Sequence, residues 1–283
     1  MRALPASALA ACGLIVSACG GTATGVPAAD QMARRDAGPT ASATAGKAGP
    51  AGSARPADKA PAARPLAGRV VVIDPGHNGG NARAPKAINR KVNVLTQWKA
   101  CDTTGTATNS GYPEAAFTWD VSKRLAKILR SRGATVKLTR SSNTGVGPCI
   151  TERAAIGNDS KADAAISVHA DGSSPGNRGF HVIMPKKIGG PVDPVVGASS
   201  RLGKSVRDAF REGTGLPYST YIGDKGLDYR NDLGGLNLST VPKIFIEAGN
   251  MRNAGEAAKF RDPEFRQRIA VALANGLQDY LRP

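Results

Sequence analysis

The 283-residue sequence is poor in the residue types that most often signal a bound metal or a disulfide-rich fold. It contains three histidines and four cysteines, and aromatic residues make up 5% of the chain. No two cysteines have the short spacing that structural zinc sites typically use, so a zinc-finger module is excluded. An internal repeat is also lacking, which excludes a repeat array. The few histidines therefore become the first candidates for chemistry.

Acidic residues are scarce as well. The chain has 22 of them against 38 Lys and Arg, which gives a formal net charge of +16. Such an excess favours anionic partners, of which nucleic acid is one class. Residues 1–19, however, have one early charge, Arg2, and then an uncharged run that is too short to span a bilayer as a mature helix. This pattern is typical of an export signal, whose removal would take away one charge and leave +15. Export favours an anionic envelope polymer or lipid headgroup as the partner over nucleic acid.

The export segment ends in Val16-Ser17-Ala18-Cys19-Gly20, which resembles a bacterial lipobox. In such a motif Cys19 would be acylated after cleavage and would anchor the protein to the membrane. Plain cleavage after a small residue, which would give a freely secreted protein, is the alternative. Residues 20–65 almost lack large apolar side chains, so they cannot bury enough surface to offset their ordering entropy. We expect a disordered tether there and one folded domain over residues 66–283.

Two cysteines, Cys101 and Cys149, remain in the expected mature domain. In an exported protein such a pair most simply forms a disulfide. Closing a loop of this length would stabilise the fold by roughly 4 kcal/mol on the chain-entropy model. The alternative is that both are zinc ligands, but their neighbours suggest loops without paired-ligand spacing.

Strand and helix signals alternate along residues 66–283. Short apolar runs bounded by Gly, Pro or charged turns predict five strands, at 69–73, 135–139, 164–168, 179–184 and 243–246. Helical periodicity predicts helices at 114–132, 151–158, 196–212 and 263–281. The alternation predicts an α/β fold: a single domain with a mostly parallel or mixed central sheet and helices on both faces.

Polar side chains follow three of the predicted strands. His77 comes shortly after the first, His169 after the third and Glu247 after the last. Each residue alone is more often structural, but the carboxyl ends of parallel strands share one edge of a sheet, where ligands commonly bind. Glu114 opens the long helix 114–132, which would start near the same edge, although the helix dipole alone also favours a glutamate there. Neutral imidazole and carboxylate groups that converge are typical of a catalytic zinc site.

The third histidine, His181, alternates with Phe180 and Val182 along its predicted strand, so we expect it on the opposite face of the sheet in a structural role. Asp120, Asp171 and Asp224 are candidates for hydrogen bonds that support the site, and nothing in the sequence selects among them.

With these residues in order, the sequence resembles the zinc-dependent N-acetylmuramoyl-L-alanine amidase family, whose catalytic domain is often called Amidase_3. The resemblance spans residues 69–281. It rests on Asp74-Pro75-Gly76-His77, Glu114, Thr139-Arg140, Arg153, Ser167-Val168-His169-Ala170, Leu236-Asn237 with Pro242, and Glu247 with Gly249 and Asn253. The sequence departs from the family pattern at Asp171, where Asn is common, and at Asn250, where an aromatic residue is frequent.

The resemblance implies that His77, Glu114 and His169 bind one Zn²⁺ ion and that Glu247 is the catalytic carboxylate. It implies hydrolysis of the amide between N-acetylmuramic acid and the L-alanine of the peptidoglycan stem peptide, with roles in wall remodelling and daughter-cell separation. The protein is expected to act as a monomer in the cell envelope, and the sequence does not say whether an activator protein is needed. Two alternatives remain, a zinc peptidase of the stem peptide and a non-catalytic tethered wall-binding protein.

The segment 81–111 is longer than a minimal family member needs, and it contains Cys101. One branch of the family has a similar cysteine pair, which supports a disulfide between Cys101 and Cys149. That bond would hold the insertion beside the metal.

Overall fold

The computed structural model describes residues 64–282, in which a six-stranded sheet organises the fold. The expected export segment 1–19, Cys19 and nearly all of the expected tether 20–65 lie outside the described residues. The strand order is β4-β1-β5-β8-β6-β7; all neighbouring strands are parallel except β6 and β8, which are antiparallel. The strands are β1 (Val70–Pro75), β4 (Thr135–Leu138), β5 (Ala164–Asp171), β6 (His181–Pro185), β7 (Leu227–Arg230) and β8 (Lys243–Asn250). The predicted mixed sheet is confirmed.

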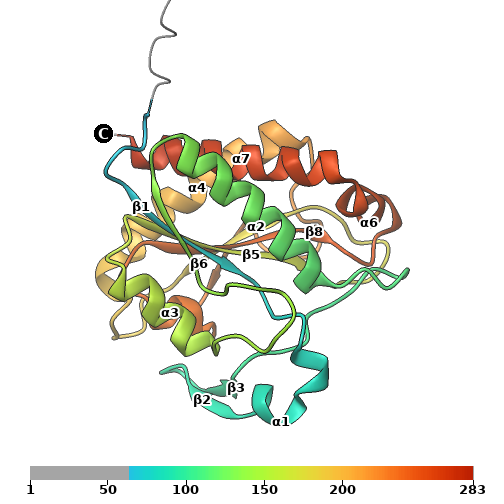
Figure 1. Cartoon of the computed structure of the whole chain (residues 1–283), viewed down its shortest axis with the longest axis horizontal. Helices are drawn as coiled ribbons and strands as arrows, with labels where there is room; N and C mark the ends of the chain where they lie inside the picture. Colours follow the sequence, from blue (N-terminus) through green and yellow to red (C-terminus); the bar gives the residue numbers. More distant parts are fainter. Residues whose placement is uncertain (1–63, 283) are drawn as a thin grey trace, which may run out of the picture. The chain divides into compact units, whose positions relative to one another are not determined.

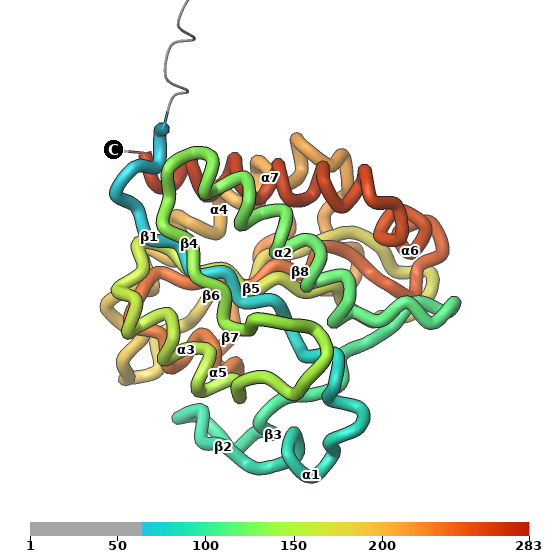
Figure 2. Tube along the Cα trace, in the orientation of Figure 1, coloured from blue at the N-terminus to red at the C-terminus, as the bar shows by residue number. Residues whose placement is uncertain are grey.

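Helices lie on both faces of this sheet (Figure 1). One face is covered by α2 (Glu114–Ser131), α4 (Val196–Thr214) and α7 (Pro263–Leu281), with α6 (Ala254–Arg261) beside α7. The other face carries α3 (Ile150–Asp159) and the short α5 (Gly234–Asn237), as the trace in Figure 2 shows. The remaining short helices are α1 (Pro85–Ile88) and the 3₁₀ turns Asn81–Arg83 and Asp193–Val195. The sheet is therefore the middle of three layers.

The two sheet faces differ in chemistry because side chains alternate along each strand. Val71 and Ile73 of β1 belong to the main apolar core beneath α2, α4 and α7, together with Val168 of β5 and Ile246 of β8. The residues between them point to the opposite face, which bears polar groups toward the carboxyl ends of the strands. The large core thus fixes the sheet, and the other face is left to carry the polar site.

Several elements differ from the sequence expectation. β5 and β8 run on to Asp171 and Asn250, so His169 and Glu247 lie inside strands and not after them. Pairing between these strands continues past an irregularity that separates His169 from Asp171. The strand β7 and the helices α5 and α6 were not predicted, because they are short and lack a clear apolar period.

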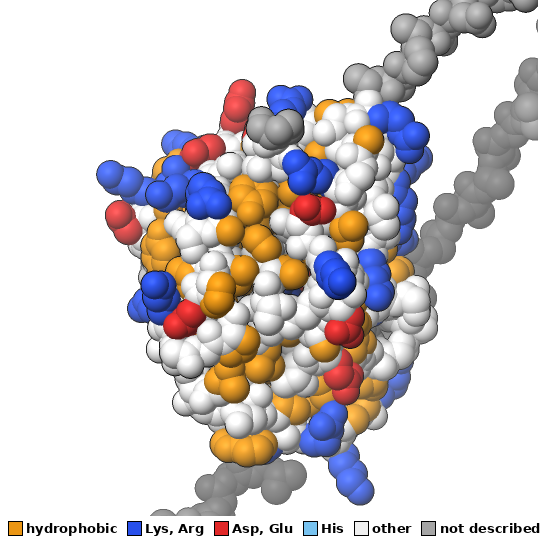
Figure 3. Space-filling view, turned by 90° about the vertical axis from the view of Figure 1, so that its left-hand side faces the viewer, with side chains coloured by type: hydrophobic (Ala, Val, Ile, Leu, Met, Phe, Trp, Pro, Cys, Tyr) orange, Lys and Arg blue, Asp and Glu red, His pale blue; other side chains and the backbone are white. Residues whose placement is uncertain are grey.

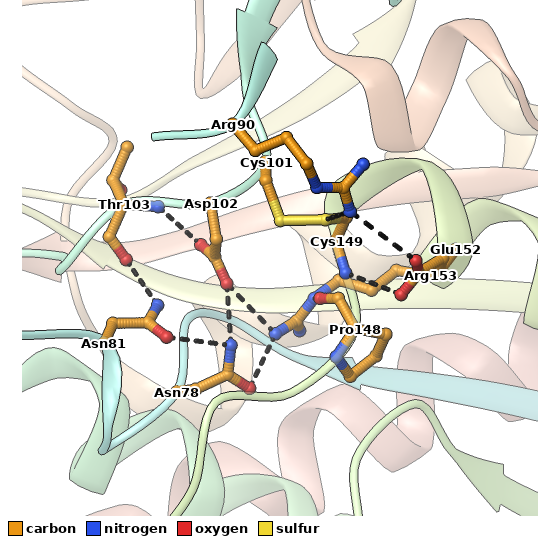
Figure 4. The surroundings of a disulfide bond; sticks show 10 residues. All are labelled: Asn78, Asn81, Arg90, Cys101, Asp102, Thr103, Pro148, Cys149, Glu152 and Arg153. Carbon is orange, nitrogen blue, oxygen red and sulfur yellow. Dashed lines mark hydrogen bonds and ion pairs between the residues drawn. A yellow bond between two sulfur atoms is a disulfide. The ribbon is translucent and has the colours of Figure 1, made fainter. Parts of the chain in front are cut away.

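The insertion forms a small antiparallel hairpin of β2 (Lys91–Asn93) and β3 (Trp98–Ala100). Cys101 follows β3 directly and forms a disulfide with Cys149, the residue that precedes α3, which confirms the predicted bond (Figure 4). Both cysteines are buried against Val92 and Val94. The disulfide therefore fastens the hairpin to the helix on the polar face of the sheet.

Asp74, near the end of β1, is the centre of a buried charged network. Its carboxylate accepts hydrogen bonds from the hydroxyls of Ser167 and Thr139 at 2.5 and 2.6 Å, and it pairs with Arg153 at 2.8 Å and Lys243 at 3.3 Å. Burial alone would raise the pKa of Asp74, but the two cations and two hydroxyls outweigh it and hold the pKa well below its usual range. The network joins β1, β4, β5 and β8 at the edge where the candidate site lies.

Replacing Asp74 with asparagine should lower the free energy of unfolding by about 3 to 5 kcal/mol, because buried Lys243 would lose its counter-charge and buried Arg153 would keep only its pair with Asp102. Urea unfolding of the two proteins measures this difference. The same carboxylate makes stability depend on pH: its contribution is present above the ordinary aspartate pKa and is lost as the pH falls through its depressed folded-state value. The matched control is Asp208→Asn, whose exposed pair with Arg207 should matter by less than about 1 kcal/mol. Equal stability of the Asp74 variant and the parent would contradict this account.

None of the helices within residues 64–282 is both long enough and apolar enough to cross a membrane. On the face seen in Figure 3, Lys and Arg side chains are spread around the margins, with acidic side chains among them. The positive charge on this face is therefore dispersed.

Candidate metal centre and active site

His77 stands on a sharp turn just beyond β1. Its φ angle of 57° lies in the left-handed region, which is uncommon for residues other than glycine and which histidine adopts more often than most. The backbone there is fixed from two sides, since the Gly76 N–H donates to the Val168 carbonyl at 3.0 Å and Arg153 donates to the His77 carbonyl at 3.0 Å. A strained backbone held this firmly is characteristic of functional sites. The turn brings the imidazole back toward α2.

Glu114, the first residue of α2, lies between the two histidines. Its Oε2 atom is 3.2 Å from His77 Nε2, and its Oε1 atom is 2.9 Å from His169 Nδ1. The carboxylate also accepts backbone N–H groups of Thr106 and Ala170 at 2.9 and 3.2 Å. The potential ligand atoms of the three residues all lie within 4.8 Å of one another. The structure thus brings together the three residues expected from the sequence to bind a metal.

Two glycines allow the backbone to pack directly on this cluster. A Cβ atom at Gly105, where φ is 73°, would lie 2.7 Å from a ring carbon of His77 and 2.8 Å from Glu114 Oε2. A Cβ atom at Gly76 would lie 2.3 Å from the ring of His169. Larger residues at either position would displace the imidazoles, so these close approaches fix the positions of both rings.

The electrostatics of the cluster favour a cation. Burial would lower the pKa of His77, but Glu114 and Asp102 outweigh it and raise the pKa to about 10. Burial likewise opposes ionisation of Glu114, yet the two histidines bring its pKa below the usual range. The cluster therefore favours positive charge beside the Glu114 carboxylate, and a metal ion could take the place of the imidazole protons that face it. Two imidazoles and one carboxylate match the ligand set of known catalytic zinc sites.

Glu247 is the second carboxylate at this site. It is the register partner of His169 on the neighbouring strand, so the two side chains lie on the same face of the sheet. Glu247 is partly exposed as a residue, but its Oε2 atom is buried and has no hydrogen-bond partner among the described residues. Burial, Glu114 and Asp171 raise the pKa of Glu247 well above its usual range. An unpartnered carboxylate oxygen beside a possible metal site is suited to a proton or a substrate group.

These residues share one open cleft of about 410 Å³. The charged or ionisable side chains that line it are His77, Glu114, His169, Asp171, Arg230 and Glu247. A second cavity of about 410 Å³ lies on the hairpin side of the histidines, between Trp98 of β3 and Phe245 of β8. Phe245 stacks on His169 with their ring centroids 5.4 Å apart, and it lines both spaces. The histidine pair is therefore open to ligands on two sides.

His181 lies on the sheet face opposite to Phe180 and Val182, as expected, but its surroundings are less ordinary than a structural role suggests. It pairs in register with Glu247 across the antiparallel β6–β8 contact and is 1% exposed. Burial lowers its pKa, and its Nδ1 atom lacks a hydrogen-bond partner among the described residues. His169, Glu247 and His181 thus form one row across three strands.

Of the three aspartates proposed to support the site, one reaches the cleft. Asp171 accepts a hydrogen bond from the Tyr221 hydroxyl at 2.9 Å and lies near enough to Glu247 to raise its pKa. Asp120 instead pairs with arginines on α2 and α7, and Asp224 belongs to a turn before β7.

Sequence reasoning missed Asp102 and Thr103. The Nδ1 atom of His77 lies 3.1 Å from the Thr103 carbonyl oxygen and 3.4 Å from Asp102 Oδ1. Their position directly after Cys101 in the insertion was the available signal, since a disulfide there was expected to bring this segment to the metal.

Comparisons with known proteins show the family of this chain. The sequence profile of a family described as N-acetylmuramoyl-L-alanine amidase matches residues 71–279. The N-acetylmuramoyl-L-alanine amidase Rv3717 of Mycobacterium tuberculosis is 40% identical over 218 residues, which are 76% of this chain and 88% of that protein. Structures of the N-acetylmuramyl-L-alanine amidase Ami1 from Mycobacterium smegmatis and Mycobacterium abscessus both match with a TM-score of 0.72, at 39% and 43% identity. They cover 76% of this chain and 98% and 100% of theirs. The chain therefore belongs to the N-acetylmuramoyl-L-alanine amidase family.

Proposed function

We propose that this protein is a zinc-dependent peptidoglycan hydrolase that cleaves the amide between N-acetylmuramic acid and the L-alanine of the stem peptide. The observation that supports it most strongly is the convergence of His77, Glu114 and His169 beside the unpartnered oxygen of Glu247 in one cleft. The three grouped residues would hold one Zn²⁺ ion. When bound, the ion would polarise the scissile carbonyl and lower the pKa of a water molecule.

The remaining chemistry would fall to Glu247. Its Oε2 atom is free to accept the proton of an attacking water and to return it to the leaving amine of L-alanine. The rings of His77 and His169 would keep the reacting centre in one place, and the cleft of about 410 Å³ that Asp171 and Arg230 line would receive the stem peptide. The proposed hydrolysis therefore needs one metal ion and one general base, and its substrate is an extended polymer.

We also propose the cellular setting. The export segment 1–19 would direct the protein to the cell envelope, with acylated Cys19 as a membrane anchor and residues 20–65 as a tether for the catalytic domain 66–283. The net charge of +15 that is left after removal of the export segment (16 − 1) would favour contact with anionic wall polymers. The protein would then act as a monomer in wall remodelling and daughter-cell separation.

Mass spectrometry of a muropeptide incubated with the purified protein tests this function. We expect release of a stem peptide with a free L-alanine N-terminus and an intact glycan part, abolished by a chelator and restored by zinc. Shortened peptides that keep the lactyl amide would instead identify a zinc peptidase. Binding to wall polymer without cleavage of any bond, in the presence of zinc, would identify a wall-binding protein.

A further inference from the structure

The ring of His77 has acceptor groups at the nitrogen that faces away from Glu114. Nδ1 lies 3.1 Å from the Thr103 carbonyl oxygen and 3.4 Å from Asp102 Oδ1, while Nε2 faces Glu114 at 3.2 Å. The Thr103 hydroxyl, at 3.2 Å from Nδ1, can donate or accept. The carbonyl and the carboxylate can only accept, so they keep a proton on Nδ1, and Glu114 is likewise an acceptor at Nε2. A metal ion held by Nε2 would therefore displace the proton shared with Glu114, while the proton on Nδ1 stays.

Asp102 is itself fixed on every side. It is 6% exposed, and its Oδ2 atom accepts from Asn78 at 2.8 Å and from Arg153 at 3.3 Å. Its Oδ1 atom, which faces His77, accepts from the Thr103 backbone N–H at 2.7 Å. Figure 4 shows this carboxylate joined by dashed lines to Asn78, Arg153 and Thr103. A buried carboxylate with this many partners is built to hold one orientation.

The disulfide is adjacent in the chain to this carboxylate and restrains its segment. Cys101 is adjacent to Asp102 and is bonded to Cys149, 48 residues later in the chain. The backbone of the same segment is bonded on both sides, since Cys101 N–H donates to the Arg90 carbonyl at 2.7 Å and Ile150 N–H donates to the Cys101 carbonyl at 2.9 Å. Arg153, one helical turn beyond Cys149, then reaches back to Asp102. The cross-link thus joins the insertion to the helix that carries the arginine partner of Asp102.

We propose that Asp102 is a positioning residue for His77, through its ion-pair contact with Nδ1 and through its hydrogen bond to Thr103, whose carbonyl lies against Nδ1. The Cys101–Cys149 disulfide holds Asp102 there, so that the affinity of this site for zinc depends on the disulfide. The inference rests on the proposed zinc site. Hydrogen-bond partners of metal-binding histidines orient the ring and increase its basicity, and their loss typically weakens metal binding by roughly 10- to 100-fold. The disulfide therefore acts on the metal through Asp102, in addition to its contribution to fold stability.

The test is a double-mutant cycle on zinc affinity, measured by competition with a chromophoric chelator. Asp102→Asn should raise the zinc dissociation constant by about 10- to 100-fold. The pair Cys101→Ser with Cys149→Ser should weaken zinc binding in the parent but add little in the Asp102→Asn background, because the route through Asp102 is already lost. The Co²⁺-substituted protein provides a second readout, since its visible absorption spectrum should change in Asp102→Asn if the ring of His77 is no longer held.

The matched control is Asp163→Asn, which also removes an arginine-paired carboxylate but lies beside Val70 at the start of β1. It should leave zinc affinity unchanged. Zinc affinity of Asp102→Asn within twofold of the parent overturns the proposal, and so do equal effects of removing the disulfide in both backgrounds. If the serine pair does not fold, Asp102→Asn and its Co²⁺ spectrum decide. If the parent protein binds zinc and cleaves muropeptide, and Asp102→Asn binds zinc equally well, only this inference is refuted. If the parent protein binds no zinc, the proposed function is refuted.

Discussion

Replacing Glu247 with glutamine should lower kcat for muropeptide hydrolysis by roughly 10²- to 10⁴-fold while one zinc ion per chain is retained. Glutamine has nearly the same shape as glutamate, but it cannot accept and return a proton. Within residues 64–282, Glu247 has no hydrogen-bond partner on Oε2 and is not one of the three grouped residues, so neither the fold nor the metal should depend on its charge. A loss of kcat with unchanged zinc content would assign Glu247 to proton transfer and not to metal binding.

Single-turnover cleavage followed by mass spectrometry, with zinc content measured on the same samples, gives both quantities. Asp171→Asn is the matched control, because it changes a third carboxylate of the cleft, one that already accepts a hydrogen bond from Tyr221. Its effect on kcat should be much smaller. Undiminished turnover by the Glu247 variant would remove this residue from the mechanism.

Much of the candidate site was predictable because its parts are encoded locally. An apolar run that breaks at Asp74-Pro75-Gly76 specifies a strand end, and the rule that parallel strands share a carboxyl edge places His77 near His169. Glu114 follows from the start of a long helix with a clear apolar face. These local patterns and one rule of sheet geometry made the residues candidates, and the family resemblance implied their roles as metal ligands and catalytic carboxylate.

The parts that could not be predicted depend on contacts between distant segments. Alternation placed His181 on the correct face, but its pairing with Glu247 follows from the antiparallel position of β6 beside β8, which no local pattern encodes. Asp102 reaches His77 through a hairpin and a disulfide, so its role has no periodic signal. The lengths of β5 and β8 were underestimated for a related reason: pairing across the irregularity after His169 supports residues that have no apolar alternation.

The position of the disulfide shows how the insertion serves both stability and the site. Its cysteines are buried with Val92 and Val94 in a small apolar cluster apart from the main core. This cluster lies on the polar face of the sheet, where few other apolar contacts hold the loop that carries Asp102 and Thr103. A covalent bond is therefore the strongest restraint available to a segment that must contact His77 with fixed geometry.

Replacing Glu114 with glutamine should reduce zinc affinity by at least about 100-fold, since even outer partners of metal ligands are worth 10- to 100-fold. Hydrolysis should then fall to the level seen with a chelator. The variant keeps the shape of the side chain, but its single amide oxygen can accept only one of the hydrogen bonds that Thr106 and Ala170 donate to the two carboxylate oxygens. We therefore expect a modest loss of stability, and circular dichroism checks that the variant folds. What it lacks is the negative charge between His77 and His169, whose Nε2 and Nδ1 atoms lie 3.2 and 2.9 Å from the carboxylate. Chelator competition measures the affinity, and Glu264→Gln, an exposed glutamate in the first turn of α7, is the matched control. Full zinc content and full turnover in the Glu114 variant would show that Glu114 does not hold the ion.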